Sequence, residues 1–310
     1  MADVSIVEFE SANEMLRGSL YLPRGSHEGL AGVVMAPGFG ATIPMGGDGY
    51  AQALCDAGFA ALLYDHAGFG MSGGESRQEV NPWRQVHGYR SAVSFLSARR
   101  EIDESRIAVW GFSYSGGIAL IAAATDERVA AAVALIPALG SVLPPPDDDG
   151  SLFGHVRDIV RGGPAAWPAG TTVGPLPIVT SDPLNTPAVV PVPSAFRWSI
   201  EYGGRFKSGW QNVATVVRPD ALAPLHAGFC APHLTVPSLW VIAPEDEVPG
   251  ADPTVSRASY DAAGGDKELH PIDGGHFGLL TWPSEPAREA TAVQVRFLQT
   301  ALRRSVDGCG

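Results

Sequence analysis

Residues 106–118 read Arg-Ile-Ala-Val-Trp-Gly-Phe-Ser-Tyr-Ser-Gly-Gly-Ile, a short apolar stretch followed by a turn and a run of small residues. The apolar stretch 106–110 predicts a strand, and the small-residue run 114–125 predicts a helix. Between them, the pattern G-x-S places Ser113 in a sharp turn that projects its hydroxyl group into a cleft. The second glycine of the usual G-x-S-x-G is replaced here by Ser115, which is small enough to fit. Because a helix N-terminus favours nearby negative charge, we predict that Ser113 is a nucleophile.

Two glycine-rich patterns earlier in the chain compete with this one. Residues 70–74 (GMSGG) match G-x-S-x-G by letters, and residues 68–73 (GFGMSG) match the dinucleotide-binding pattern G-x-G-x-x-G. Both patterns need a strand before them and a helix after them, but the polar run GESRQEVNP follows here. We therefore interpret residues 68–74 as a glycine-rich loop after a strand that ends at Tyr64.

Strand and helix patterns alternate on both sides of the Ser113 turn. Short apolar runs predict strands at 17–23, 31–36, 59–64, 106–110, 129–136, 237–243 and 267–272. Helical spacing predicts helices at 47–57, 84–99, 114–125, 253–263 and 283–304. Near-continuous apolar strands alternating with helices indicate an α/β fold, a mostly parallel sheet with helices on both faces. In such a sheet, ligands bind at the carboxyl ends of the strands.

Residues 137–232 interrupt this alternation. The segment contains the run PPPDDDG at 144–150, several Gly-Pro and Val-Pro pairs, and many aromatic residues. We predict an inserted cap at 137–232, partly helical, between the two parts of a core domain at 1–136 and 233–310. The tail 306–310 is expected to fray.

A serine nucleophile needs a base, and the base needs an orienting carboxylate. His276, in the sequence DGGHF, follows a predicted strand on a glycine-rich loop, and we predict that it is the base. Among the other histidines, His66 follows a strand and could line the cleft, whereas His270 is expected to pack inward from its strand. Asp246 is the predicted acid, with Glu245 and Glu247 as alternatives in the same turn. The order Ser, Asp, His along the chain agrees with the order known for folds of this kind.

Acyl transfer also requires hydrogen-bond donors for an oxyanion. One donor is expected to be the backbone N–H of Tyr114, directly after the nucleophile. The second is expected to be the N–H of Phe39 in the loop Ala-Pro-Gly-Phe-Gly at 36–40, where Gly38 allows the chain to turn. A plain glycine turn is the alternative interpretation of that loop.

Five motifs together resemble the α/β-hydrolase superfamily. They are PGFG at 37–40, YDHAGFGMSGG at 64–74, WGFSYSGG at 110–117, APEDEVP at 243–249 and GGHF at 274–277. Within the superfamily the chain is similar to the branch of acetyl-xylan-esterase-like, dienelactone-hydrolase-like and X-Pro-dipeptidyl-peptidase-like serine hydrolases. WGFSYSGG and the sequence GWQN at 209–212 also resemble hydrolases of polyketide-type metabolism. The resemblance covers 1–140 and 233–305 and says little about substrate, because this fold supports many chemistries.

The function predicted from these residues is that of a serine hydrolase. Ser113, His276 and Asp246 would cleave a carboxylic ester, lactone or thioester through an acyl-enzyme. The same three residues would also serve a carbon–carbon bond hydrolase or an acyltransferase, and a non-catalytic binding protein is a third alternative. Trp198, Tyr202 and Trp210 of the cap are candidates for binding a largely apolar substrate, with the core of the cap itself as the alternative role.

Composition limits the partners and the location. The chain of 310 residues has a net charge of −12 and no basic stripe, which argues against nucleic acid and against an anionic membrane surface. Cys55, Cys230 and Cys309 form neither a disulfide framework nor a zinc motif, so no metal and no cofactor are expected. The N-terminus shows no signal-peptide pattern and no apolar run is long enough to span a membrane, which favours the cytoplasm. We expect a small-molecule substrate, and a homodimer stays an open alternative.

Overall fold

The computed structural model describes residues 2–25, 28–221 and 225–303. The tail 306–310, predicted to fray, and Cys309 within it lie outside the described residues. An eight-stranded sheet forms the centre, with its strands in the order β1-β2-β4-β3-β6-β7-β10-β11. The strands are β1 (Ala2–Ser11), β2 (Glu14–Pro23), β3 (Leu30–Ala36), β4 (Ala60–Tyr64), β6 (Ile102–Phe112), β7 (Val129–Leu135), β10 (Ser238–Ile242) and β11 (Lys267–Pro271). Because β2 pairs antiparallel with β1 and β4 while the other neighbours pair parallel, the predicted mostly parallel sheet is confirmed.

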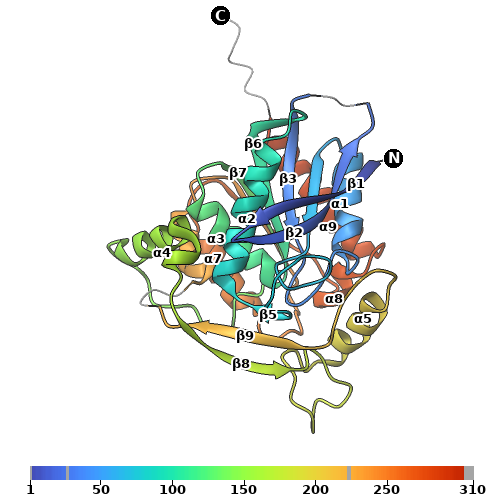
Figure 1. Ribbon diagram of the computed structural model, residues 1–310, viewed down its shortest axis with the longest axis vertical. Coiled ribbons are helices and arrows are strands. Elements are labelled where there is room, and N and C mark those ends of the chain that lie inside the picture. The colour runs from blue at the N-terminus through green and yellow to red at the C-terminus, as the bar shows by residue number, and fades with distance from the viewer. Residues whose placement is uncertain (1, 26–27, 222–224, 304–310) are drawn as a thin grey trace, which may run out of the picture.

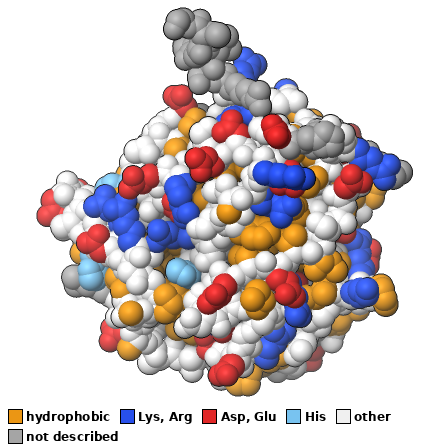
Figure 2. All heavy atoms as spheres, turned by 45° about the horizontal axis from the view of Figure 1, so that its top comes forward, with side chains coloured by type: hydrophobic (Ala, Val, Ile, Leu, Met, Phe, Trp, Pro, Cys, Tyr) orange, Lys and Arg blue, Asp and Glu red, His pale blue; other side chains and the backbone are white. Residues whose placement is uncertain are grey.

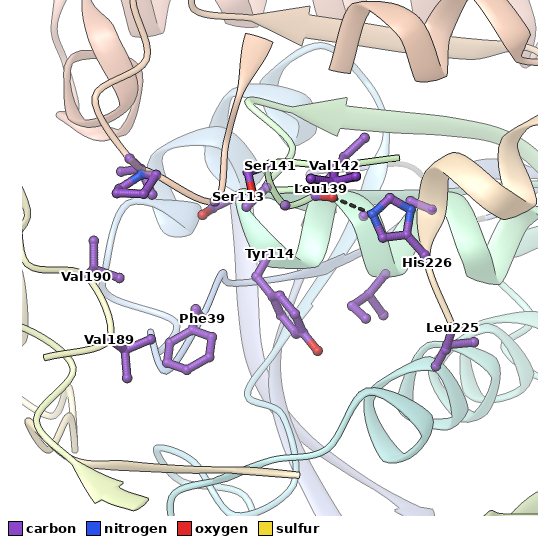
Figure 3. Close-up of a pocket in the computed structure, with 18 of the residues that line it drawn as sticks. Phe39, Ser113, Tyr114, Leu139, Ser141, Val142, Val189, Val190, Leu225 and His226 are labelled. Carbon is purple, nitrogen blue, oxygen red and sulfur yellow. Dashed lines mark hydrogen bonds between the residues drawn. The ribbon is translucent and has the colours of Figure 1, made fainter. Parts of the chain in front are cut away.

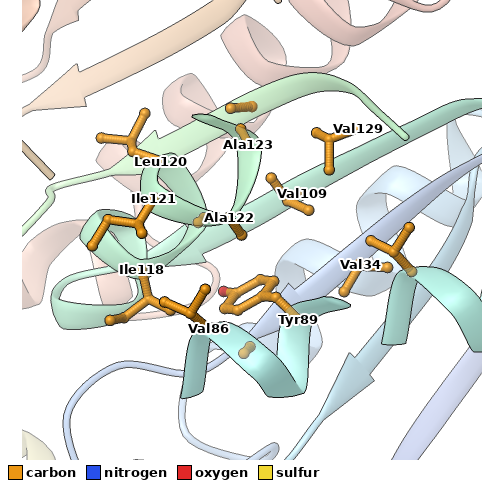
Figure 4. Close-up of a cluster of buried hydrophobic side chains, with 14 of the residues drawn as sticks. Val34, Val86, Tyr89, Val109, Ile118, Leu120, Ile121, Ala122, Ala123 and Val129 are labelled. Carbon is orange, nitrogen blue, oxygen red and sulfur yellow. The ribbon is translucent and has the colours of Figure 1, made fainter. Parts of the chain in front are cut away.

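Helices cover both faces of this sheet, as predicted (Figure 1). One face carries α2 (Pro82–Ser97), α3 (Tyr114–Thr125), α6 (Ala227–Cys230) and α7 (Pro253–Ala262), and the other carries α1 (Gly47–Asp56), α8 (Gly275–Leu280) and α9 (Glu285–Ala301). Along β6, Val109 faces the first cluster and Trp110 the second, which is the two-residue period of a strand buried on both sides. Figure 4 shows strand residues such as Val109 meeting Tyr89 of α2 and Ile118 of α3. Each such buried apolar side chain contributes about 1.5–3 kcal/mol to folding.

The segment 137–232 adds helices and strands that are not part of the central sheet. It contains α4 (Ser151–Gly162), η1 (Gly163–Ala166), β8 (Gly170–Leu176), α5 (Pro193–Gly203), β9 (Ala214–Pro219), α6 and the start of η2 (Ala231–His233). β8 pairs antiparallel with β9, and β9 pairs parallel with the short β5 (Glu79–Val80) from the first part of the chain. Figure 1 shows β8 and β9 crossing below the lower end of the central sheet, between α4 and α5.

Three local details differ from the sequence-based expectations. β1 was not among the predicted strands, because its apolar side chains Val4 and Ile6 stay 53% and 67% exposed at the edge of the sheet. His276 was predicted on a loop, but it lies in the first turn of α8. The expectation that His270 packs inward was wrong: β11 is the other edge strand, and the His270 side chain, 35% exposed, lies 3.2 Å from Glu268.

Side chains of both charges are mixed on one face of the molecule. On the face shown in Figure 2, Lys and Arg side chains are scattered among Asp and Glu side chains. Among the helices that the structure describes, none has both the length and the apolar character needed to cross a membrane.

Candidate active site

Ser113 occupies the turn between β6 and α3 in a strained backbone conformation, with φ 55° and ψ −127°. Three backbone hydrogen bonds of 2.9 Å hold it there: Ser113 N donates to the carbonyl of Leu135, and the carbonyl of Ser113 accepts from Gly116 N and Ala138 N. Gly111 must lack a side chain, because a Cβ there would lie 2.0 Å from the carbonyl oxygen of Ser115. The sharp turn predicted from G-x-S is therefore present, and it places Ser113 in the wall of two adjoining cavities.

One hydrogen-bonded chain joins the side chains of Ser113, His276 and Asp246. His276 Nε2 lies 2.9 Å from Ser113 Oγ, and His276 Nδ1 lies 2.7 Å from Asp246 Oδ2. The His276 and Asp246 side chains are only 2% and 3% exposed, so water competes little with these contacts. A neutral imidazole that donates from Nδ1 to the carboxylate accepts the serine proton at Nε2, which is the arrangement that activates a hydroxyl group.

In the acidic turn at 245–247, the carboxylates of Asp246 and Glu247 have different hydrogen-bond partners. Asp246 Oδ1 accepts a hydrogen bond from Val248 N at 2.9 Å, which fixes the carboxylate that faces the imidazole. Glu247 Oε2 accepts a hydrogen bond from the backbone N–H of His276 at 2.7 Å. Burial raises the pKa of Glu247, but hydrogen bonds led by the one from His276 N outweigh it and leave this pKa below its ordinary value. Glu247 therefore anchors the histidine backbone, while Asp246 contacts the ring.

The loop that carries Phe39 passes close to the nucleophile. A Cβ on Gly38 would lie 3.0 Å from the Cβ of Ser113, so only glycine permits this approach. The ring of Phe39 packs edge-on against that of Tyr114, with centroids 5.8 Å apart. Within the residues that the structure describes, the backbone N–H groups of Phe39 and Tyr114 have no hydrogen-bond acceptor. Tyr114 is the first residue of α3, and Phe39 directly follows the glycine that approaches Ser113.

Ser115, in the place of the usual glycine, connects the turn to this loop. Its hydroxyl group donates a 2.5 Å hydrogen bond to the carbonyl of Pro37, and its oxygen lies 2.8 Å from His66 Nε2. Since the serine proton is already used, His66 must carry its own proton on Nε2 and donate it to Ser115. Burial lowers the pKa of His66 to about 3, so the ring is neutral near pH 7. The sequence allowed His66 to line the cleft, but it is 2% exposed and lines neither cavity beside Ser113.

The glycine-rich loop at 68–74 has a structural role, as interpreted from its sequence. Ser72 Oγ donates a 2.5 Å hydrogen bond to the carbonyl of Asp65, and Ser72 is 2% exposed. The two carboxylate oxygens of Asp65 accept hydrogen bonds from Ile43 N and Met71 N. Burial raises the pKa of Asp65 to about 7 despite these bonds. The loop is therefore tied to the segment that follows the Phe39 loop.

A cavity of about 520 Å³ opens beside Ser113 and has a mostly apolar wall (Figure 3). Its lining includes Phe39, Tyr114, Ile118, Ile121, Leu139, Val142, Val189, Val190, Leu225 and Val248. His226 also lines it, but its Nε2 donates to the carbonyl of Leu139 and its Nδ1 accepts from Gly228 N. Because both ring nitrogens are occupied, His226 contributes its ring as part of the wall. The lining contains no Asp, Glu, Lys or Arg among the described residues, which suits an uncharged ligand.

A second cavity, of about 50 Å³, shares Ser113 with the first but extends toward His276, Phe277 and Trp198. Trp198 is the one candidate from the cap that the structure places at a cavity wall. Tyr202 is 1% exposed, and its hydroxyl group accepts a hydrogen bond from Trp282 N. Trp210 packs against the backbone of Gly203, where a Cβ would lie 2.4 Å from its ring. Neither Tyr202 nor Trp210 lines these two cavities, because both are used to hold α5 in place.

Comparison with known proteins agrees with this geometry. The pattern of the X-Pro dipeptidyl-peptidase (S15) family matches residues 15–142, which include Ser113 but neither Asp246 nor His276. The crystal structure of the α/β hydrolase GrgF from Penicillium sp. sh18 covers 97% of this chain and 99% of its own, with a TM-score of 0.73 and 23% identity. The chain has the α/β-hydrolase fold. The fold expected from its motifs is thereby confirmed.

The curated relatives that the chain resembles match over less than half of their length. Thiohydrolase apmlB of Arthrinium phaeospermum is 39% identical over 133 residues, which are 43% of this chain and 42% of the relative. The quorum-quenching protein AidA of Acinetobacter baumannii is 32% identical over 131 residues, 42% of this chain and 43% of the relative. GrgF itself, named a polyketide transferase, is 36% identical over 142 residues, 44% of this chain and 46% of the relative.

Two polar contacts of the site were not predicted from the sequence. Glu247 was considered only as an alternative acid, although its carboxylate holds the backbone of His276. The bond between His66 and Ser115 joins residues 49 positions apart, and no local pattern reports such a contact. The usable signal was the serine at a glycine position, since a buried hydroxyl group requires partners. No group of three His, Cys, Asp or Glu side chains suited to a metal ion occurs in the part of the chain that the structure describes.

Proposed function

We propose that this protein is a serine hydrolase that cleaves a carboxylic ester, lactone or thioester with a largely apolar acyl group. The observation that carries the proposal is the hydrogen-bonded chain from Ser113 through His276 to Asp246 at the wall of an apolar cavity. A buried serine, histidine and carboxylate in this order along the chain form the constellation used for acyl transfer on this fold. The names of the relatives, which include a thiohydrolase, agree with it.

The chemistry follows from the positions of the three side chains. His276 Nε2 removes the proton of Ser113 as Oγ attacks the acyl carbon, and Asp246 stabilises the resulting imidazolium. The N–H groups of Phe39 and Tyr114 donate to the oxyanion, and each such donor contributes about 3–4 kcal/mol to transition-state stabilisation. His276 then returns the proton to the leaving group. Water attacks the acyl-enzyme in the second half of the reaction, with His276 again as the base.

The segment 137–232 acts in this proposal as a cap over the site. Val189, Val190 and Leu225 from this segment line the larger cavity together with residues of the core. An apolar wall without charged side chains favours an acyl group made mostly of carbon and hydrogen. The expected partner is accordingly a small-molecule substrate.

Acyl transfer to an acceptor other than water is the second candidate function. It is favoured by GrgF, a relative that is named a polyketide transferase and shares the fold along nearly its whole length. Hydrolysis and transfer use the same acyl-enzyme and differ only in the nucleophile that resolves it. Reaction of a simple ester in the presence of added alcohols separates them: a transferase forms the new ester in preference to the free acid.

The proposed nucleophile is tested by labelling with a fluorophosphonate probe, which phosphonylates activated serines. The wild-type protein should be labelled and should hydrolyse p-nitrophenyl esters, and Ser113→Ala should lose both properties while keeping its fold. Ser141→Ala is the matched control, because Ser141 lines the same cavity but does not contact His276. Equal labelling of Ser113→Ala and wild type would overturn the assignment. A folded wild-type protein that is not labelled would favour a non-catalytic binding protein.

A further inference from the structure

The two cavities beside Ser113 share one part of their wall and then diverge. Both are lined by Phe39, Ser113, Val190 and Val248. The larger cavity continues along α3 to Leu225 and His226, while the smaller one continues under α5 and along α8. Ser113 therefore stands at the junction, where an acyl carbon under attack would send one substituent into each cavity.

The position of His276 decides which substituent enters which cavity. His276 gives its proton to the leaving-group oxygen, so that oxygen must lie within hydrogen-bond reach of Nε2. His276 and Phe277 line the smaller cavity, and neither lines the larger one. The leaving group therefore occupies the smaller cavity, and the acyl chain occupies the larger one along α3.

The two cavities differ about tenfold in volume, about 520 Å³ against about 50 Å³. With about a tenth of the space, the smaller cavity accepts a much smaller group than the larger one does. The larger cavity accommodates an extended alkyl chain or fused rings. The size limit thus applies to the leaving group and not to the acyl group.

Packing around the smaller cavity keeps it narrow. The Trp198 ring stacks on that of Tyr202 with centroids 5.0 Å apart, and its N–H donates to the carbonyl of Leu280 at 3.3 Å. On the opposite side of the wall, the carbonyl of Ile178 accepts a 2.8 Å hydrogen bond from Val190 N. These contacts hold Trp198, Ile178 and Val190 in place, so widening the cavity requires the contacts to break.

We infer, on the basis of the proposed function, that the enzyme cleaves carboxylic esters with a large apolar acyl part and an alcohol part of only a few atoms. A methoxy or ethoxy group fits this description, and so does the short ring arm of a small lactone. In each case, an ester oxygen that carries a short alkyl group lies beside His276. A pantetheine-type thioester or a bulky aryl alcohol exceeds the space available.

The same geometry limits the nucleophile that resolves the acyl-enzyme. Because His276 activates it, this nucleophile approaches from the space that the leaving group has vacated. A cavity of about 50 Å³ admits water or a small alcohol but excludes a second molecule as large as the acyl group. Hydrolysis is therefore favoured over transfer to a large acceptor.

A series of esters of one acid tests the inference on the wild-type enzyme. Methyl, butyl and benzyl decanoate share an acyl group, and methanol and benzyl alcohol are leaving groups of similar acidity, so size is the main difference between these two. The value of kcat/KM should fall by at least about tenfold from methyl to benzyl, since a pocket that cannot expand rejects added groups by such factors. A γ-lactone with a long alkyl chain on its acyl part tests whether the smaller cavity accepts the short arm of a ring as well as a free alcohol part. Equal or faster cleavage of benzyl decanoate, or of the N-acetylcysteamine thioester, would overturn the inference.

Three variants separate the two cavities. Trp198→Ala widens the smaller one and should raise the benzyl-to-methyl ratio of kcat/KM at least about fivefold, with Ile178→Ala as the second variant if the first does not fold. Leu225→Trp narrows the larger cavity and should lower the ratio of kcat/KM for methyl decanoate to kcat/KM for methyl acetate by a similar factor. Phe206→Ala is the matched control, because Phe206 is an aromatic residue of the same segment that is 86% exposed and lines neither cavity. If widening leaves the benzyl-to-methyl ratio at the wild-type value, the small cavity does not select the leaving group.

The outcomes also distinguish this inference from the proposed function. A protein that resists the fluorophosphonate probe and cleaves none of the esters contradicts both. A protein that is labelled at Ser113 but prefers the benzyl ester contradicts only the assignment of the small cavity to the leaving group.

Discussion

The hydroxyl group of Ser115 donates a hydrogen bond to the carbonyl oxygen of Pro37, with the two oxygens 2.5 Å apart. This contact joins the two loops that carry the proposed oxyanion donors, since Pro37 lies two residues before Phe39 and Ser115 directly follows Tyr114. His66 holds the serine oxygen from the other side at 2.8 Å. The spacing of the two N–H donors thus depends on a side chain that does not itself contact the substrate.

Ser115→Ala should impair catalysis without unfolding the protein. The change releases Pro37 and leaves the His66 Nε2–H without an acceptor, so the Phe39 loop is held less firmly. We expect kcat to fall by about tenfold, less than the 10²–10³ that follows loss of a whole oxyanion donor, with little change in KM. Ser259→Ala is the control, because Ser259 is equally buried but bonds to Val255 within α7. A Ser115→Ala enzyme with wild-type kcat and a lower Tm would assign a purely structural role to Ser115.

His66 should make the protein less stable in acid. Its pKa is lowered by burial from 6.5 to about 3 in the folded chain, so between these values the unfolded chain binds a proton that the folded chain does not. The free energy of unfolding should therefore decrease as pH falls from about 6.5 toward about 3, by up to about 1.4 kcal/mol per pH unit from this one group. His66→Gln keeps an N–H donor for Ser115 and does not titrate, so its stability should depend less on pH.

Urea denaturation at several pH values between 4 and 7.5 measures this difference. His155→Gln, at an exposed position of α4, controls for the general effect of replacing a histidine. Parallel stability curves for His66→Gln and wild type would contradict the prediction.

The three acids of the turn 245–247 should differ sharply in their effect on activity. Asp246→Ala removes the carboxylate that orients the His276 ring and should reduce kcat by about 10⁴, the scale known for such a loss. Glu247→Ala frees the backbone N–H of His276 and should reduce kcat by about tenfold, because the ring still meets its carboxylate. Glu245→Ala, at an exposed position, serves as the control. Steady-state kinetics with one ester measure kcat for the three variants. A larger loss of kcat in Glu247→Ala than in Asp246→Ala would reverse the roles of the two carboxylates.

The sequence was sufficient to predict the central strands of the sheet and the three side chains that meet beside it. Each buried strand is a short apolar run; Ser113 and Asp246 each follow such a strand, and His276 follows the edge strand β11. Because parallel strands end on one edge of a sheet, residues far apart in sequence are brought together there. The edge strand β1 was not predicted. Its Val4 and Ile6 side chains face solvent, so its sequence contains no buried apolar run.

Residues outside the strands were less predictable. Trp198, Tyr202 and Trp210 look alike as aromatic residues of an irregular segment, yet only Trp198 reaches a cavity, because Tyr202 and Trp210 pack against Trp282 and Gly203. The bond of Ser115 to Pro37 spans 78 positions. Such contacts depend on tertiary geometry rather than on any local period of the sequence.

Two glycines should respond in opposite directions to the addition of one methyl group. In Gly111→Ala, the new Cβ would lie 2.0 Å from the carbonyl oxygen of Ser115, in backbone that cannot move without disturbing the Ser113 turn. We expect a loss of about 3 kcal/mol in the free energy of unfolding, at the upper end of the cost of overpacking. In Gly154→Ala, no atom from outside the local helix backbone lies within 4 Å of the new Cβ, and the position is inside α4, so a gain of about 0.5–1 kcal/mol is expected from helix propensity. Chemical denaturation of both variants measures the contrast. If Gly111→Ala is as stable as wild type, β6 and α3 do not approach each other as closely as the turn requires.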